Sequence, residues 1–171
     1  MMTRRTLLTT LAALGLGGGA ARTIGADSKT TKSTPAAPSN ISKVSLSDAE
    51  WKARLTSEQY YVLRKEGTEA PGTSALNREK RKGTYHCAGC DLPLFSSAAK
   101  YESGTGWPSF HTSLPGAVGL KTDYKMILPR TEYHCARCEG HHGHVFDDGP
   151  QPTGKRYCNN GVALKFVPVS A

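Results

Sequence analysis

Two Cys-x-x-Cys pairs most constrain what this chain can fold into. The pairs are CAGC at residues 87–90 and CARC at residues 135–138, and each follows a Tyr-His dipeptide. Two such turns can place four thiolates at about 2.3 Å from one Zn²⁺ ion, in a closed site with no open position for catalysis. Two disulfides are the competing interpretation for an exported protein, but a disulfide across Cys-x-x-Cys closes a small strained ring. The pattern favours one structural zinc, with four predicted ligands: Cys87, Cys90, Cys135 and Cys138.

The fifth cysteine, Cys158 in GKRYCNNG, stands outside both pairs. A lone cysteine is most often an inert packing residue. This one follows Arg156 by two positions, and a positive neighbour favours the nucleophilic thiolate. Upstream, GHHGHVFDDG holds His141 and His144, which could donate or relay protons near neutral pH. A second metal site is the alternative interpretation of these histidines. The pattern indicates a reactive thiol beside proton donors.

The amino-terminal segment carries most of the basic charge. The net charge of the chain is +8, and residues 1–44 contribute +5 of it. A nucleic-acid-binding surface on the remainder is therefore not expected. Residues 1–26 run from basic to apolar to small side chains, which is the plan of an export signal. The apolar run is too short and too glycine-rich for a stable spanning helix.

The export route has several interpretations. Arg4-Arg5 resembles the twin-arginine signal, whereas a general secretory signal, an uncleaved anchor and an organelle transit peptide are the alternatives. We expect an exported protein, periplasmic or otherwise extracytoplasmic; the alternatives are tethering to a membrane by an uncleaved signal and an organellar location. Residues 27–44 are rich in Ser, Thr, Pro and Lys and predict a flexible linker. The folded domain is therefore expected at residues 45–171.

Helix signals precede strand signals in the folded part. Ser47 with Glu50, and Thr56 with Gln59, predict two capping boxes that each begin a short helix, and Gly67 is expected to end the second. After this glycine, short apolar or alternating runs such as GTYHC and GVALKF are separated by Gly, Pro, Asn and Asp. Such runs are typical of strands and turns. The predicted fold class is mainly β, of the α+β kind.

Seven ordered motifs resemble one known family. They are EQYYVLRKEGTE, YHCAGC, LFSS, YESGTGWPSF, CARC, GHHGHVFDDGPQPTGKRYCNNG and ALKF, spread over residues 45–168. Together they resemble the B-type methionine sulfoxide reductases, which are specific for the R epimer of methionine sulfoxide. The resemblance implies two antiparallel β-sheets with short N-terminal helices, one structural zinc per chain, and catalysis by Cys158 of the RYCxN motif.

The resemblance also implies roles for residues around this cysteine. Trp107 of GWPSF would form the wall for the S-methyl group of the substrate. His141 and His144, with Asn160, would hydrate and protonate the sulfoxide oxygen. Cys158 would attack the sulfur of a protein-bound methionine-R-sulfoxide and become a sulfenic acid. An external thiol such as thioredoxin would then restore the free cysteine.

Further members of the implied substrate-binding network are Arg156 of the RYC motif and Asp148 of the DGP segment. The implied partners are oxidised proteins or peptides and a thioredoxin-like reductant. We expect a monomer that binds no nucleic acid and has no stable membrane insertion once its signal is cleaved.

Three positions depart from the commonest pattern of the family. Thr105 stands where many members have a recycling cysteine, His142 stands where leucine is usual, and Gly72 replaces a bulky aromatic residue. Two other functions remain as alternatives. One is a zinc-ribbon-like binding module in which Cys158 is inert, and the other is a redox sensor that signals through a sulfenic acid.

Overall fold

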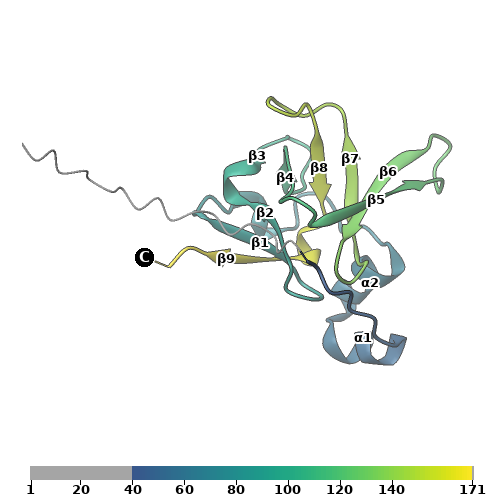
Figure 1. Cartoon of the computed structure of the whole chain (residues 1–171). Coiled ribbons are helices and arrows are strands. Elements are labelled where there is room, and N and C mark those ends of the chain that lie inside the picture. The colour runs from purple at the N-terminus through teal and green to yellow at the C-terminus, as the bar shows by residue number, and fades with distance from the viewer. Residues whose placement is uncertain (1–39, 171) are drawn as a thin grey trace, which may run out of the picture. The chain divides into compact units, whose positions relative to one another are not determined.

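The computed structural model describes residues 40–170, in which two α-helices precede a β-rich body (Figure 1). The helices are α1 (Asp48–Arg54) and α2 (Ser57–Lys65). The strands within this range are β1 (Gly83–Cys87), β2 (Pro93–Ser96), β3 (Lys100–Tyr101), β4 (Ser109–Phe110), β5 (Val118–Asp123), β6 (Arg130–Cys135), β7 (His141–Phe146), β8 (Arg156–Asn159) and β9 (Leu164–Pro168). Short 3₁₀ helices connect them: η1 (Ala75–Arg78), η2 (Ser97–Ala99) and η3 (Gly161–Ala163).

Both α-helices begin at the capping boxes that the sequence predicts. The Ser47 hydroxyl accepts the backbone N–H of Glu50, whose carboxylate accepts the N–H of Ser47. Thr56 and Gln59 exchange the same pair of hydrogen bonds at the start of α2. Each box satisfies two N–H groups that a helix start would otherwise leave unpaired.

The end of α2 differs from the prediction in one detail. Glu66, rather than Gly67, adopts the left-handed conformation, with φ of 54°. The N–H of Gly67 then donates to the carbonyl of Tyr61 at 3.0 Å. A Cβ on Gly67 would lie 2.2 Å from the Tyr61 ring, so a larger residue here would displace that exposed ring.

Two antiparallel sheets form the body, which confirms the predicted fold class. The three-stranded sheet has the order β2-β1-β9, and the six-stranded sheet has the order β3-β4-β8-β7-β6-β5. Figure 1 shows β8, β7 and β6 side by side, with β1, β2 and β9 in the second sheet. The chain passes from β8 through η3 directly into β9 of the other sheet. The segment that follows β8 therefore links the two sheets.

Aromatic side chains fill the space between the sheets. Phe95 of β2 stacks on Phe110 of β4 with ring centroids 4.4 Å apart, and it meets Tyr133 and Tyr157 edge-on at 6.0 and 5.8 Å. These geometries are the favourable ones for aromatic pairs. Successive residues of a strand face opposite sides. Because Tyr157 of β8 faces the core, the next residue, Cys158, faces the other side of the six-stranded sheet.

The predicted export signal, residues 1–26, lies outside the described residues, as does most of the predicted linker at residues 27–44. Within the described range, Ile41 and Val44 pack against the core, and the N–H of Val44 donates to the carbonyl of Arg137 at 2.8 Å. None of the helices in residues 40–170 has the length and apolar content needed to cross a membrane.

Candidate functional site

The four paired cysteines form one buried cluster. Their sulfur atoms all lie within 4.8 Å of one another. The Sγ–Sγ distance is 3.6 Å between Cys87 and Cys138 and 3.4 Å between Cys90 and Cys135. A disulfide needs about 2.05 Å, whereas sulfurs at about 2.3 Å from a tetrahedral zinc lie about 3.8 Å apart. None of the five cysteines forms a disulfide. The cluster fits a metal ion held by four thiolates and disfavours the disulfide interpretation.

The two cysteine turns have the same backbone geometry. The N–H of Asp91 donates to the carbonyl of Cys87 at 2.8 Å, and that of Glu139 donates to the carbonyl of Cys135 at 2.9 Å. Asp91 and Glu139 both adopt left-handed conformations, with φ of 63° and 58°. One turn follows β1 and the other follows β6. A metal bound here would therefore join the two sheets.

Cys158 lies on β8 between two polar neighbours. It pairs with Ser109 of β4 on one side and with His144 of β7 on the other. Residues directly opposite each other in an antiparallel pair share one face of the sheet. A Cβ on Gly143 would lie 1.9 Å from the carbonyl oxygen of Cys158, so only glycine permits this close approach of β7. The thiol and the imidazole thus lie on the same face, away from the aromatic core.

A pocket of about 140 Å³ lies on this face of the sheet. It combines aromatic walls with a few polar groups, a composition typical of binding sites for small ligands. Four predicted site residues come together there, and the full lining is Thr68, Trp107, Arg130, Gly143, His144, Phe146, Cys158, Asn159 and Asn160.

Burial of Cys158 outweighs its positive neighbour. Burial raises the pKa of the Cys158 thiol above its usual range, while the Arg156 guanidinium and the Thr105 hydroxyl lower it by smaller amounts. The predicted effect of Arg156 is therefore correct in direction but does not dominate. The resting group at neutral pH is the protonated thiol, so its proton must be removed as the sulfur reacts.

His144 is held by an acidic side chain that also binds an arginine. Its Nε2 lies 2.7 Å from Oδ2 of Asp123, and Arg130 donates to the same oxygen at 2.7 Å. The backbone N–H of Lys125, followed by His144 and Arg130, lowers the pKa of Asp123 well below its usual range. Asp123 therefore stays a carboxylate and fixes the orientation of the imidazole.

The second predicted histidine lies behind the first. His141 is 3% exposed, and its ring centroid is 5.6 Å from that of His144. Its Nδ1 lies 3.0 Å from Oε1 of Glu132 without hydrogen-bond alignment, and Nζ of Lys121 lies 3.2 Å from the other oxygen. Burial lowers the pKa of His141, and the carboxylate of Glu132 offsets part of this effect. His141 contacts the pocket through His144 rather than lining it.

Arg156 and Asp148 form an ion pair beside the pocket. The guanidinium donates two hydrogen bonds of 2.8 Å to the carboxylate, which lowers the pKa of Asp148. The same guanidinium lies 4.3 Å from the ring centroid of Phe146, a wall of the pocket. Because neither Arg156 nor Asp148 lines the pocket, their contact with a bound substrate would be indirect, through the Phe146 wall.

The side chains of Asn160 and Trp107 both form hydrogen bonds with the backbone of Glu69. The Asn160 amide donates to the carbonyl of His142 at 3.0 Å and accepts the N–H of Glu69 at 2.9 Å. The indole N–H of Trp107 donates to the carbonyl of Glu69 at 3.1 Å. The polar atoms of both side chains are thus engaged by the protein's own backbone.

Sequence reasoning missed Asp123, Glu132 and Glu69. Acidic residues are depleted in strands, so Glu132, inside the strand-like run YKMILPRTEYHC, carried a usable signal, whereas Asp123 lies just before that run and carried none. For Glu69 the one signal was its place at the end of the motif EQYYVLRKEGTE; the motif does not reveal its partners, because they lie far along the chain.

His142, the departure from leucine, is fully buried beside Tyr133. Neither ring nitrogen has a hydrogen-bond partner among the described residues. Burial lowers the pKa of His142 to about 3. An unpaired buried polar group costs about 1–3 kcal/mol. We therefore expect His142→Leu to raise the free energy of unfolding of the metal-loaded protein by about 1–3 kcal/mol at pH 7.5, with activity retained, as measured by urea denaturation.

The stability gain from His142→Leu should grow in mild acid. The folded-state pKa of His142 lies below the unfolded value of about 6.5, so only the unfolded chain takes up this proton as pH falls from about 7 toward 3. Comparing the two proteins cancels the contribution of every other group. The difference should increase by about 1 kcal/mol between pH 7.5 and 5.5; a difference that stays constant would contradict a neutral buried imidazole.

Comparison with known proteins adds an independent finding. Residues 55–168 match the SelR domain. The chain is 53% identical over 123 residues to "Peptide methionine sulfoxide reductase B1, chloroplastic" of Oryza sativa subsp. japonica, covering 71% of this chain and 58% of that protein. It is 52% identical over 136 residues to "Methionine-R-sulfoxide reductase B2, mitochondrial" of Rattus norvegicus, covering 74% and 78%. With "Peptide methionine sulfoxide reductase MsrB" of Pseudomonas putida (strain W619) it shares 51% identity over 129 residues, covering 75% and 97%.

Coverage differs among these relatives. The chain spans less than two thirds of the rice protein, but nearly the whole of the bacterial one. Among solved structures, the "Yippee-like" domain of Mis18 aligns over 53% of this chain and 100% of its own length, with 16% identity and a TM-score of 0.42, a likeness too weak to support a functional conclusion. The SelR match and the identity of about one half together show that the chain belongs to the SelR-domain family of MsrB methionine-R-sulfoxide reductases.

Proposed function

We propose that this protein reduces methionine-R-sulfoxide in proteins and peptides to methionine. One observation carries the proposal: the cysteine outside the metal cluster lies in a pocket with an indole wall and a carboxylate-held histidine. The names of the relatives state the same chemistry for those proteins. A pocket of about 140 Å³ has room for the end of a methionine side chain, with the rest of the polypeptide outside.

The proposed reaction transfers one oxygen atom. Sγ of Cys158 attacks the sulfoxide sulfur as its thiol proton leaves, and the sulfoxide oxygen is protonated. The oxygen then bonds to Sγ of Cys158 as its bond to the methionine sulfur and the sulfur–sulfur bond both break, so methionine leaves and Cys158 carries the oxygen as a sulfenic acid. The methionine sulfur is reduced by two electrons, and the cysteine sulfur is oxidised by two. This is nucleophilic catalysis assisted by a general acid.

His144 is the proposed proton carrier. It is opposite Cys158 in the β7–β8 pair and lines the same pocket. Asp123 orients its ring, so the ring can take the thiol proton and deliver a proton to the sulfoxide oxygen. Asn160 supports the floor of the pocket through its two backbone hydrogen bonds.

Recycling is proposed to use an external thiol. The position where a resolving cysteine would stand is Thr105, whose hydroxyl bonds to that of Ser103 at 2.9 Å. A first external thiol forms a mixed disulfide with Cys158 and releases water. A second thiol attacks the mixed disulfide and frees the cysteine, leaving the reductant as a disulfide. A thioredoxin-like protein supplies such a thiol pair.

We propose one structural Zn²⁺ in the four-cysteine cluster. The support is the burial of the four thiols, their sulfur–sulfur distances and their origin in two similar turns. Zinc there would fix the turns and take no part in the reaction, because four thiolates complete its coordination. Export through a twin-arginine-like signal is also proposed; its support is the sequence of residues 1–26.

The function is tested with a peptide that carries one methionine sulfoxide, supplied as separated epimers with dithiothreitol as reductant. We expect only the R epimer to be consumed, as measured by chromatography. Trp107→Ala should lower kcat/KM by about tenfold or more, because the wall that orients the methyl group is lost. Trp107→Phe, which keeps an aromatic face, should lose less. Equal consumption of both epimers by the unmodified protein would contradict the proposal.

A further inference from the structure

We propose that Glu69 is the positioning residue that fixes Trp107 relative to Cys158. The inference rests on the proposed function, because Trp107 matters only if it faces a substrate. Glu69 lies in the loop between α2 and η1 and is half-buried. Its carboxylate and its backbone bind different parts of the site at the same time.

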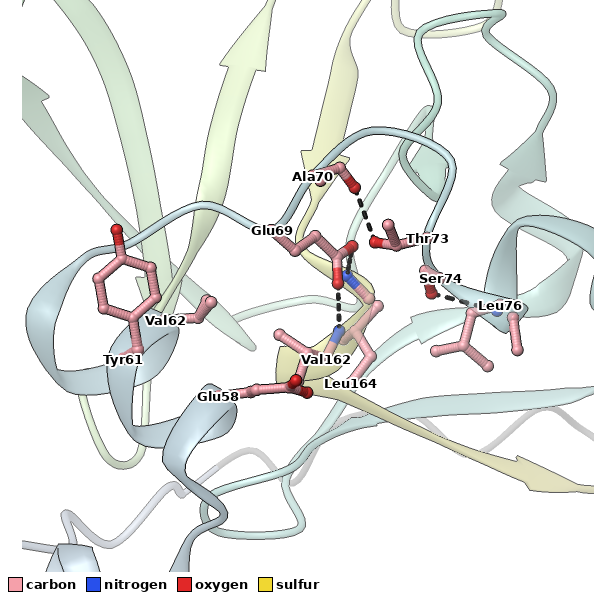
Figure 2. A pocket seen from close by; sticks show the side chains of 12 residues that line it. Glu58, Tyr61, Val62, Glu69, Ala70, Thr73, Ser74, Leu76, Val162 and Leu164 are labelled. Carbon is pink, nitrogen blue, oxygen red and sulfur yellow. Dashed lines mark hydrogen bonds between the residues drawn. The ribbon is translucent and has the colours of Figure 1, made fainter.

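The carboxylate of Glu69 holds the segment that follows the reactive cysteine. Its Oε1 accepts the N–H of Gly161 at 2.5 Å, and its Oε2 accepts the N–H of Val162 at 3.0 Å. Figure 2 shows the carboxylate directed at these two amides. Hydrogen bonds to an ionised acceptor are about twice as strong as neutral ones. The two amides begin η3, immediately after the strand that bears Cys158.

The backbone of Glu69 holds the pocket wall and floor. Its carbonyl accepts the indole N–H of Trp107 at 3.1 Å, and its N–H donates to the Asn160 amide at 2.9 Å. The same loop makes one more bond to the tryptophan segment, from the N–H of Gly72 to the carbonyl of Gly106 at 2.7 Å. The loop is therefore hydrogen-bonded to the tryptophan segment. The carboxylate and N–H of Glu69 bind the same loop to the residues that follow Cys158.

Gly72 fits this arrangement. Its φ is 79°, a conformation that glycine adopts without strain, and a Cβ there would meet no atom within 4 Å. The glycine lets the loop turn back toward Gly106 while its N–H makes the bond described above. Loss of the Glu69 carboxylate would release the loop from η3, and the indole would move with it. A displacement of about 1 Å at a reacting site can cost roughly 100-fold in rate.

The test compares three substitutions in the full-length protein. Glu69→Ala removes the carboxylate, and Glu69→Gln keeps its shape but removes its charge. Glu58→Gln is the matched control. Glu58 and Glu69 both line a second pocket, of about 640 Å³, which is separate from the pocket that contains Cys158 (Figure 2). Unlike Glu69, Glu58 has no side-chain hydrogen bond or ion pair within residues 40–170. The metal content and the circular dichroism spectrum of each variant show whether it is folded. If Glu69→Ala does not fold, the test is made with Glu69→Gln.

Three readouts separate positioning from a general structural role. We expect kcat/KM for the R-sulfoxide peptide to fall about tenfold in Glu69→Ala and about threefold in Glu69→Gln, with Glu58→Gln unchanged. The alkylation rate of Cys158 by iodoacetamide should stay within about twofold, since Glu69 does not touch the sulfur. In the Trp107→Ala background, Glu69→Ala should add little further loss, because the two residues act through one contact. Full additivity of the two substitutions, or unchanged kcat/KM in Glu69→Ala, would overturn the inference.

A spectroscopic readout keeps this inference separate from the proposed function. In protein labelled with 5-fluorotryptophan, Glu69→Ala should shift the ¹⁹F signal assigned to Trp107 and leave that of Trp51 unchanged. If the unmodified protein reduces the R-sulfoxide and the Trp107 signal does not move, the role of Glu69 fails and the function stands. If the signal moves but the unmodified protein reduces no sulfoxide, the proposed function fails, and with it the catalytic meaning of the contact.

Discussion

Cys158→Ser is expected to abolish sulfoxide reduction, by roughly a thousandfold or more, while the fold and the bound metal are retained. Cys158 is the one cysteine outside the four-cysteine cluster, and it lies in the pocket beside Trp107 and His144. A serine hydroxyl is a far weaker nucleophile near neutral pH and forms no sulfenic acid. The measurement is the steady-state rate with the R epimer of a peptide methionine sulfoxide.

The control for this substitution is a set of properties that it should not change. Serine differs from cysteine by one atom, and Cys158 is not part of the four-cysteine cluster. The metal content, the circular dichroism spectrum and the midpoint of urea unfolding should therefore match those of the unmodified protein. Substantial activity in a variant with these properties intact would remove Cys158 from the mechanism.

Removal of the metal is expected to unfold the protein. The four thiols come from two turns that follow strands of different sheets, and they are buried within 4.8 Å of one another. Binding of Zn²⁺ to such sites supplies about 10–16 kcal/mol, which is comparable to or larger than the whole stability of an ordinary domain. Cys90→Ser or Cys135→Ser should therefore give a protein that holds less than one metal ion and has lost its cooperative unfolding transition.

Metal content and folding should be followed together during chelation. Elemental analysis is expected to give one zinc per chain before treatment, and the circular dichroism signal should decay in step with the loss of zinc. Cys158→Ser is the matched control, because it also removes a thiol but should keep one zinc. A metal-free protein that stays folded and active would contradict a structural role for the cluster.

The local signals in the sequence predicted much of the fold. Both capping boxes begin helices where expected because their bonds lie within four residues of the chain. The two cysteine turns lie together as their spacing predicts. The order of the strands in the sheets could not be predicted from such signals. It depends on pairings such as β1 with β9, which join residues far apart in the chain.

The site was predicted in part for the same reason. Cys158, His144 and Trp107 belong to recognisable motifs, and all three line the pocket. The acidic partner of His144 lies on β5, and only the folded sheet brings Asp123 to the imidazole. A motif also does not show how deeply each of its side chains is buried. Motifs group His141 with His144, although one is buried behind the other.

A single turnover is the most direct test of the central claim, that Cys158 takes the oxygen from a bound sulfoxide. The reduced protein, free of other thiols, is mixed with one equivalent of a peptide methionine-R-sulfoxide in the presence of dimedone, and both products are analysed by mass spectrometry. The account predicts one methionine formed per dimedone adduct on Cys158, with no disulfide between this residue and the cluster cysteines. Cys158→Ser should form neither product, and Thr105→Cys should replace the adduct by a disulfide between residues 105 and 158. Methionine formed without modification of Cys158, or a disulfide from Cys158 to Cys87, Cys90, Cys135 or Cys138, would contradict it.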